Sequence, residues 1–276
     1  MRRRDFLATG CATLGAGFTT FDLRPWTFDV PPAGLQLYSL RTEMQRDVEG
    51  TLRRLGALGY REVEFAGYFG RTPAQVRDAV KAAGLTAPAA HIPLEALDGD
   101  ALAATADAAL EAGHAGLIVA WLPAPLRGSL DAWRAMADRF NDLGRRLGER
   151  NLHFAYHNHE FEFAPLDGRV PYEVLLERAD PALVGLELDL YWATKAGHDP
   201  LALVRAHPGR FPLVHVKDAS PAPELRQVDV GTGTIDFAAI FAAGKGIRHA
   251  FIEHDQPADP WAFAAASLAA YRKLGA

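Results

Sequence analysis

Short apolar runs alternate with longer amphipathic segments along the whole chain after Pro31. The short runs are typical of buried strands, and the longer segments repeat their apolar positions at the helical period. Eight strands are predicted at residues 34–39, 62–66, 86–91, 116–121, 152–157, 184–189, 212–216 and 250–253. Helices are predicted between them at residues 47–58, 73–83, 100–112, 130–149, 172–178, 200–206 and 237–243, and a last helix at 261–273.

This alternation predicts an α/β fold with parallel strands, because each helix returns the chain to the edge where the next strand starts. Eight such units in about 250 residues is the size of a closed (β/α)8 TIM barrel. An open doubly wound sheet is the alternative. The barrel is favoured because polar residues follow many strands, whereas an open sheet concentrates them at one switch point.

The first residues, MRRRDFLATGCATLGAGFTTF, differ from this pattern. Arg3, Arg4, Phe6 and Leu7 resemble a twin-arginine export signal, and a basic disordered terminus is the alternative. The following apolar stretch is shorter than the ~20 residues of a stable membrane span. We therefore expect a signal peptide or disordered terminus at 1–28, a single catalytic barrel at 29–276, and export to the periplasm.

Charge and cysteine content narrow the classes of partner. Lys and Arg number 29 against 34 Asp and Glu, which gives a net charge of -5 and argues against nucleic acid as the partner. Cys11 is the single cysteine, so the chain cannot form an internal disulfide or a zinc finger. Any metal must be held by His, Asp and Glu.

Such residues follow the predicted strands. In residues 62–66, apolar Val63 and Phe65 alternate with two glutamates, so Glu64 points inward when the apolar pair packs on helices. The fifth to eighth strands end near His157, His159, Glu160, Glu187, Asp189, His215, Lys217, Glu253 and Asp255. Buried carboxylates and imidazoles are costly unless a cation or a substrate pairs with them. We expect a divalent cation, with Mn²⁺ ahead of Mg²⁺, Co²⁺, Fe²⁺ and Zn²⁺. A metal-free ion-pair network is the alternative.

The motifs YHNH followed by Glu160, LELDLYW, HVKD and FIEHD, with QLYSLR and EFAGYFG nearer the start, resemble the xylose isomerase-like sugar phosphate isomerase/epimerase superfamily. This superfamily includes inosose dehydratases, hydroxypyruvate isomerases, ketose 3-epimerases and endonuclease IV. The resemblance implies that Asp189, His215 and Glu253 hold a divalent metal. It places His157 where ketose epimerases carry a glutamate, and a shift of one or two residues would substitute His159 or Glu160.

The resemblance also implies metal-assisted removal of a proton next to a carbonyl, through a metal-stabilised enediolate. Glu253 is the predicted base, and His157 or His159 is predicted to return the proton. Lys217 either neutralises a developing oxyanion or forms a salt bridge with Asp218 or Glu187. The residues expected to contact substrate are Gln36, Glu64, His91, Glu160, Glu187 and Trp192.

The predicted function is a sugar or keto-sugar isomerase/epimerase. The alternatives are a 3-keto-glycoside lyase or hydrolase, or an inosose-type dehydratase, using the same site. A further alternative is a sugar-binding barrel without catalysis. Endonuclease activity is disfavoured because the chain is acidic and lacks a cationic groove.

Overall fold

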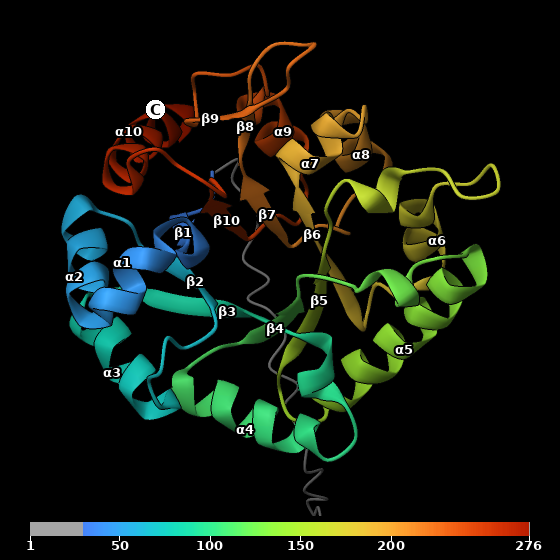
Figure 1. Cartoon of the computed structure of the whole chain (residues 1–276), viewed down its shortest axis with the longest axis horizontal. Coiled ribbons are helices and arrows are strands. Elements are labelled where there is room, and N and C mark those ends of the chain that lie inside the picture. Colours follow the sequence, from blue (N-terminus) through green and yellow to red (C-terminus); the bar gives the residue numbers. More distant parts are fainter. Residues whose placement is uncertain (1–29, 276) are drawn as a thin grey trace, which may run out of the picture.

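The computed structural model describes residues 30–275, which form a closed barrel of parallel strands surrounded by helices (Figure 1). The strands are β1 (Ala33–Gln36), β2 (Glu62–Ala66), β3 (Thr86–Ile92), β4 (Gly116–Val119), β5 (His153–His157), β6 (Val184–Asp189), β7 (Leu213–Val216) and β10 (His249–Ile252). Each strand pairs with its neighbours along the chain, and β10 closes the ring against β1. The predicted TIM barrel is confirmed and the open sheet is excluded.

The helices lie in a ring outside the strands (Figure 1). They are α1 (Arg41–Arg46), α2 (Val48–Leu58), α3 (Pro73–Ala82), α4 (Ala101–Ala112), α5 (Leu130–Gly148), α6 (Pro171–Arg178), α7 (Leu190–Lys195), α8 (Pro200–Ala206), α9 (Phe237–Ala243) and α10 (Pro260–Arg272). Short 3-10 turns are η1 (Leu37–Leu40), η2 (Leu94–Leu97), η3 (Ala124–Leu126), η4 (Phe161–Phe163) and η5 (Lys273–Gly275). A small antiparallel pair, β8 (Asp218–Ala219) and β9 (Gln227–Val228), stands outside the barrel.

Local sequence explains where several of these elements begin and end. Thr72 and Gln75 form a reciprocal capping box at the start of α3, with Pro73 in its first turn. The predicted strand 34–39 is too long: β1 ends at Gln36, whose side chain accepts a hydrogen bond from Tyr38 N and starts η1. A strand and a turn compete here, and the side-chain acceptor favours the turn.

The two faces of each strand differ in polarity. On β2, Val63 and Phe65 are fully buried in the main core against the helices, and Glu64 points to the barrel axis. Inside the barrel, Ala89, Ile118 and Ala155 form a separate small apolar cluster on which Leu213 packs. This inner layer lies between two polar ends.

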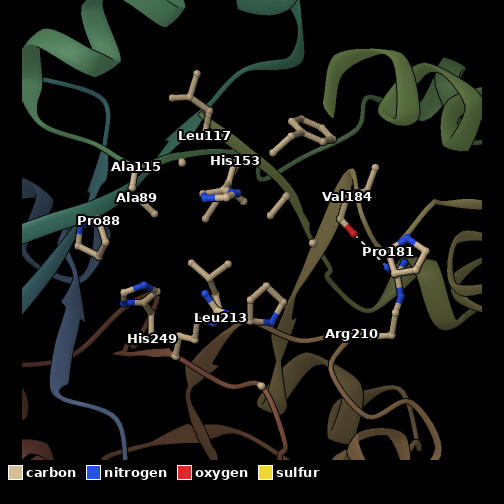
Figure 2. Close-up of a pocket in the computed structure, with 18 of the residues that line it drawn as sticks. Pro88, Ala89, Ala115, Leu117, His153, Pro181, Val184, Arg210, Leu213 and His249 are labelled. Atoms are coloured by element: carbon tan, nitrogen blue, oxygen red, sulfur yellow. Dashed lines mark hydrogen bonds between the residues drawn. The ribbon is translucent and has the colours of Figure 1, made fainter. Parts of the chain in front are cut away.

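The amino-terminal end of the barrel contains a cavity of about 360 Å³ (Figure 2). His153, Leu213 and His249 line its central part (Figure 2). Arg210 lines its edge and donates a hydrogen bond to Val184 O at 3.0 Å (Figure 2). His249 Nδ1 contacts Glu62 Oε2 at 2.8 Å. Small residues such as Ala89 and Gly116 leave this space open because they carry little side chain.

The predicted signal segment 1–28 lies outside the described residues, so it stays a prediction, as do the domain boundary after it and export to the periplasm. Within residues 30–275, none of the helices combines the length and the apolar content that a bilayer crossing requires.

Candidate metal centre and active site

The carboxyl-terminal ends of the strands bring a dense cluster of titratable side chains together around the barrel axis. The members are Glu64 on β2, His91 on β3, His157 on β5, Glu187 and Asp189 on β6, His215 on β7, and Lys217 and Glu253 just beyond β7 and β10. All are buried except His91, which is partly exposed. We call these eight residues the mouth cluster.

Glu187 lies at the base of the mouth cluster, where three imidazoles meet one oxygen. Its Oε2 lies 2.7 Å from His91 Nε2, 3.2 Å from His157 Nδ1 and 3.2 Å from His215 Nε2. Glu64 Oε2 lies 2.8 Å from the same His215 nitrogen. Because an ionised carboxylate only accepts hydrogen bonds, Nε2 of His215 carries the hydrogen.

The opposite edges of the His157 and His215 rings face Asp189. His215 Nδ1 lies 2.6 Å from Glu253 Oε2 and 3.8 Å from Asp189 Oδ2. His157 Nε2 lies 3.7 Å from the same Asp189 oxygen. Glu64 contacts Nε2 of His215, which leaves Nδ1 of that ring beside Glu253 and Asp189, and contact with a carboxylate at one nitrogen is how protein imidazoles are oriented towards metals.

The atoms at this point fit a divalent cation. Asp189 Oδ2, His215 Nδ1 and Glu253 Oε2 are buried, and no partner within residues 30–275 meets them with hydrogen-bond geometry. These three residues offer ligand atoms that lie within 4.8 Å of one another. Ligand atoms bound to one cation at about 2.1 Å are themselves about 3 Å apart, so modest adjustment would complete the site. The described residues therefore hold a possible metal-binding cluster of oxygen and nitrogen donors.

Lys217 enters the cluster from the side. Its Nζ lies 2.8 Å from Glu253 Oε2, 3.0 Å from Asp189 Oδ2 and 2.8 Å from Asp255 Oδ1. The sequence alternatives of a salt bridge with Asp218 or Glu187 do not describe these contacts. Burial opposes the charged form, but Asp189 and Glu253 outweigh it and raise the pKa of Lys217 well above its ordinary value. Lys217 is therefore a protonated ammonium at neutral pH.

Glu187 and Glu253 remain charged through their neighbours. Burial alone would raise the pKa of Glu187, but His215 and His91 outweigh it and hold the pKa well below the ordinary value. The same opposition holds for Glu253, whose pKa Lys217 and His215 lower against the effect of burial. In return, Glu64 and Glu187 overcome the burial of His91 and raise its pKa to about 9.

His157 on β5 and His159 just after it are neutral instead. Burial, reinforced by the charge of His215, lowers the pKa of His157 well below its ordinary value. Burial and then Lys217 lower the pKa of His159 to about 3. A neutral imidazole has one nitrogen with a free lone pair and one N–H that can donate a hydrogen bond, so both rings are suited to binding a cation or a ligand oxygen.

Backbone turns at the strand ends position these side chains. Asp189 ends β6 and caps α7 directly: its Oδ1 accepts from Trp192 N at 2.8 Å, while Oδ2 faces the cluster. Asn158 accepts from Asp189 N at 3.0 Å. Buried Asp218 accepts from four backbone amides, those of Ala219, Gly231, Gly233 and Ile235. The loop that carries Gly231 and Gly233 is thus a turn held by the Asp218 carboxylate.

The other predicted substrate residues divide into three groups. Gln36 Nε2 donates to Glu64 Oε2 at 2.5 Å and so joins the cluster. His159 and Trp192 stand beside it, with ring centroids 5.7 Å apart. Glu160 is exposed at the start of η4, outside the cluster, whereas His157 Nε2 lies 3.7 Å from Asp189 Oδ2.

Sequence reasoning missed one element of the site. Gln227 on β9 donates to Asp255 Oδ2 at 2.5 Å and accepts from Asp255 N at 2.8 Å, which fixes the carboxylate that holds Lys217. Gln227 lies in a two-residue strand within an irregular loop. No periodicity marks such a residue, so only the geometry reveals it.

A closed eight-stranded parallel barrel with a His/Asp/Glu cluster at its carboxyl-terminal mouth defines a class of TIM-barrel enzymes with small-molecule substrates. The family described as xylose isomerase-like TIM barrel matches residues 52–269. The chain therefore belongs to this family of sugar isomerase/epimerase-like barrels.

The individual proteins that resemble this chain share a third or less of their aligned residues with it. An inosose dehydratase of Bacillus anthracis (strain CDC 684 / NRRL 3495) is 32% identical over 88 residues, covering 32% of this chain and 29% of that protein. A crystal structure of a sugar phosphate isomerase/epimerase from Parabacteroides distasonis ATCC 8503 superposes with a TM-score of 0.74 at 24% identity, covering 90% of this chain and 96% of that one. A crystal structure of the IOLI protein with a binding zinc atom has a TM-score of 0.70 at 13% identity, covering 88% and 97%.

Proposed function

We propose that the protein is a metal-dependent enzyme that removes a proton next to the carbonyl of a sugar-like ketone and eliminates a group from the following carbon. The observation that carries this proposal is the convergence of ligand atoms of Asp189, His215 and Glu253 on one buried point, with His157 Nε2 3.7 Å from Asp189 Oδ2. A divalent cation held by these four residues would polarise the carbonyl and acidify the neighbouring C–H.

Glu253 is the base in this proposal. Its side chain keeps 6% exposure to the mouth, whereas those of Asp189, Glu187 and Glu64 keep none. Because its pKa is held low, its carboxylate is ionised and can accept a proton at neutral pH. A substrate carbon entering from the mouth therefore meets Glu253 before the other carboxylates.

Lys217 is the complementary acid. Glu253 takes the proton from carbon, the carbon–oxygen bond on the next carbon breaks, and the leaving oxygen takes a proton from Lys217 Nζ. Transfer of the proton from Glu253 to Lys217, 2.8 Å away, restores both groups without net proton change. His157 or His159, which the sequence predicts to return the proton, is the alternative acid.

Isomerisation or epimerisation is the second candidate, supported by the sugar phosphate isomerase/epimerase that superposes over 90% of the chain. Epimerisation requires a second acid on the opposite face of the substrate to return the proton, whereas a 1,2-isomerisation can return it from the same face. Glu253 and Lys217, with Oε2 and Nζ 2.8 Å apart, form a base and acid pair that suits elimination, and the inosose dehydratase relative also favours this reaction.

The test begins with elemental analysis of the full chain and of an Asp189→Asn, Glu253→Gln double variant. We expect near-stoichiometric metal, Mn²⁺ or Zn²⁺ first, in the native protein and none in the variant. The metal-loaded protein is then incubated in D2O with an inosose, a free ketose and a 3-keto-glucoside, and followed by proton NMR.

Loss of water or of the aglycone with loss of the adjacent C–H signal supports the lyase. Deuterium incorporation without elimination supports the isomerase. A protein that binds no metal when Mn²⁺ or Zn²⁺ is supplied, and exchanges no proton in any substrate, contradicts both and supports a sugar-binding barrel.

A further inference from the structure

A continuous row of rings leads from the mouth cluster to the molecular surface. Lys217 Nζ lies 5.8 Å from the Trp192 ring centroid, and Trp192 lies 5.7 Å from His159. His159 in turn lies 4.9 Å from Trp121, which lies 4.9 Å from Phe161. These four rings, Trp121, Phe161, His159 and Trp192, are called the aromatic wall. They come from the connections that follow β4, β5 and β6.

The outer end of the wall is open to solvent but held in place. Trp121 is 50% exposed, and its ring meets the Phe161 ring edge to face, at an interplanar angle of 81°. Arg127 Cζ lies 3.5 Å from the Phe161 centroid and 5.1 Å from that of Trp121, and Trp133 Nε1 donates to the Arg127 carbonyl at 3.2 Å. An indole fixed from behind loses little further freedom when a ligand stacks on its exposed part.

The inner end of the wall carries two unsatisfied polar atoms. Trp192 Nε1 and His159 Nδ1 are buried, and no residue within 30–275 meets either with hydrogen-bond geometry. A buried polar group without a partner is costly, so such atoms are natural contacts for ligand oxygens. The wall therefore offers polar contacts near Lys217 and a flat apolar surface farther out.

We propose that the aromatic wall is a subsite for a second ring, and that the substrate is a glycoside rather than a free monosaccharide. The sugar ring at the mouth cluster would place its linking oxygen near Trp192 Nε1 and His159 Nδ1, and the ring beyond that oxygen would stack on Trp121. The shared chemistry is a ring with a flat apolar face, either an aromatic aglycone or a second sugar. This inference rests on the proposed function only for the position of the reacting ring.

The test measures equilibrium binding by calorimetry with the metal-loaded full chain and three probes. The probes are methyl β-D-glucopyranoside, phenyl β-D-glucopyranoside and cellobiose, which share one sugar and differ in the second group. Stacking of one ring predicts a Kd for the phenyl glucoside or cellobiose about fivefold lower than that of the methyl glucoside. Saturation-transfer NMR is expected to detect the second ring in contact with the protein.

The variants are Trp121→Ala, Trp121→Phe and Trp261→Ala. Trp261 is a matched control, because Arg54 Cζ lies 3.9 Å from its ring and it lies on α10, away from the aromatic wall. We expect Trp121→Ala to abolish the preference for the second ring without changing the Kd of the methyl glucoside. Trp121→Phe and Trp261→Ala are expected to keep the preference.

Preference for the phenyl glucoside alone assigns an aromatic aglycone, and preference for cellobiose alone assigns a sugar. Equal affinity for all three probes, no binding of any, or a preference that survives Trp121→Ala overturns the proposal. The assay needs no turnover, so a protein that prefers ring-bearing probes but exchanges no proton contradicts the proposed function and leaves the subsite standing.

Discussion

The two ends of the barrel contain the same chemical pair in different surroundings. At the mouth, Glu64 Oε2 lies 2.8 Å from His215 Nε2, and at the amino-terminal end, Glu62 Oε2 lies 2.8 Å from His249 Nδ1. The mouth pair is fully buried, whereas the side chains of Glu62 and His249 keep 11% and 23% exposure. A Glu–His contact alone does not define a functional site.

The difference lies in what surrounds each pair. Beyond His215, atoms of Asp189 and Glu253 that lack hydrogen-bond geometry to any described residue converge on one buried point. Beyond His249 lies the cavity lined by small residues, with Arg210 bound to backbone carbonyls (Figure 2). Convergent atoms without hydrogen-bond partners, rather than the number of polar residues, distinguish the mouth as the candidate active site.

The largest expected contrast compares Glu64→Gln with Glu62→Gln, the same change two residues apart on β2. The amide that replaces the Glu64 carboxylate is neutral and holds His215 less firmly, so metal affinity is expected to fall by roughly 10–100-fold. Glu62→Gln is expected to leave metal affinity unchanged, because Glu62 contacts His249 at the other end. Competition with a fluorescent chelator measures both. An equal loss in the two variants would show that the ends are not independent.

A second contrast concerns stability in alkali. In the folded protein the pKa of His91 is about 9, above its ordinary 6.5, so folding strengthens proton binding. This contribution is complete below pH 6.5 and is lost as the pH rises through 9, by up to about 3 kcal/mol. Thermal melts of the chelator-treated protein between about pH 6 and 9.5 should therefore decline, and His91→Asn should flatten the decline. An unchanged slope in the variant would contradict this prediction.

His153, at the opposite end, should act in the opposite direction and more weakly. Partial burial of the ring, then Arg248 and His249, lower its pKa to about 4. The folded protein resists protonation there, so the stabilisation is present above pH 6.5 and is lost as the pH falls towards 4. We expect His153→Gln to flatten the acid side of the melting profile. The effect should be smaller than that of His91 because solvent screens the partly buried His153 ring more than the His91 side chain, which is 13% exposed.

The smallest expected effect tests how open the amino-terminal end is. A Cβ on Gly116 would meet only ordinary contacts, the nearest being His153 O at 3.5 Å, so Gly116→Ala should stabilise the fold by about 0.5 kcal/mol. Gly34→Ala is the contrast, because its Cβ would lie 2.5 Å from Phe251 Cδ1. Denaturant melts measure both. Destabilisation by Gly116→Ala would contradict this prediction, because it would show that the added methyl group does not fit beside His153.

The barrel could be predicted from the sequence because its signal is repeated eight times. The apolar runs located every barrel strand, and the alternation on β2 correctly oriented Glu64 towards the axis. Short elements were not predicted. Helix α7 has six residues, too few to display a helical period, and it follows β6 without a loop.

The candidate site was predictable only in part, because its geometry depends on contacts between segments that are far apart in the sequence. Position at a strand end identified Asp189, His215 and Glu253, but their mutual distances depend on the closure of the ring. The choice among His157, His159 and Glu160 depends on a turn after β5, where Glu162 accepts from His159 N at 2.8 Å. Such a tertiary contact leaves no periodic trace in the sequence.

Asp189 restricts the routes by which this barrel can acquire a new specificity. One oxygen of its carboxylate caps the helix that carries Trp192, and the other faces the candidate cation. A substitution of Asp189 that removes both carboxylate oxygens therefore changes the ligand set and also releases the start of the helix that carries Trp192. Mutational paths that change the metal without changing the substrate have to avoid this position and pass through Glu253 or His157 instead.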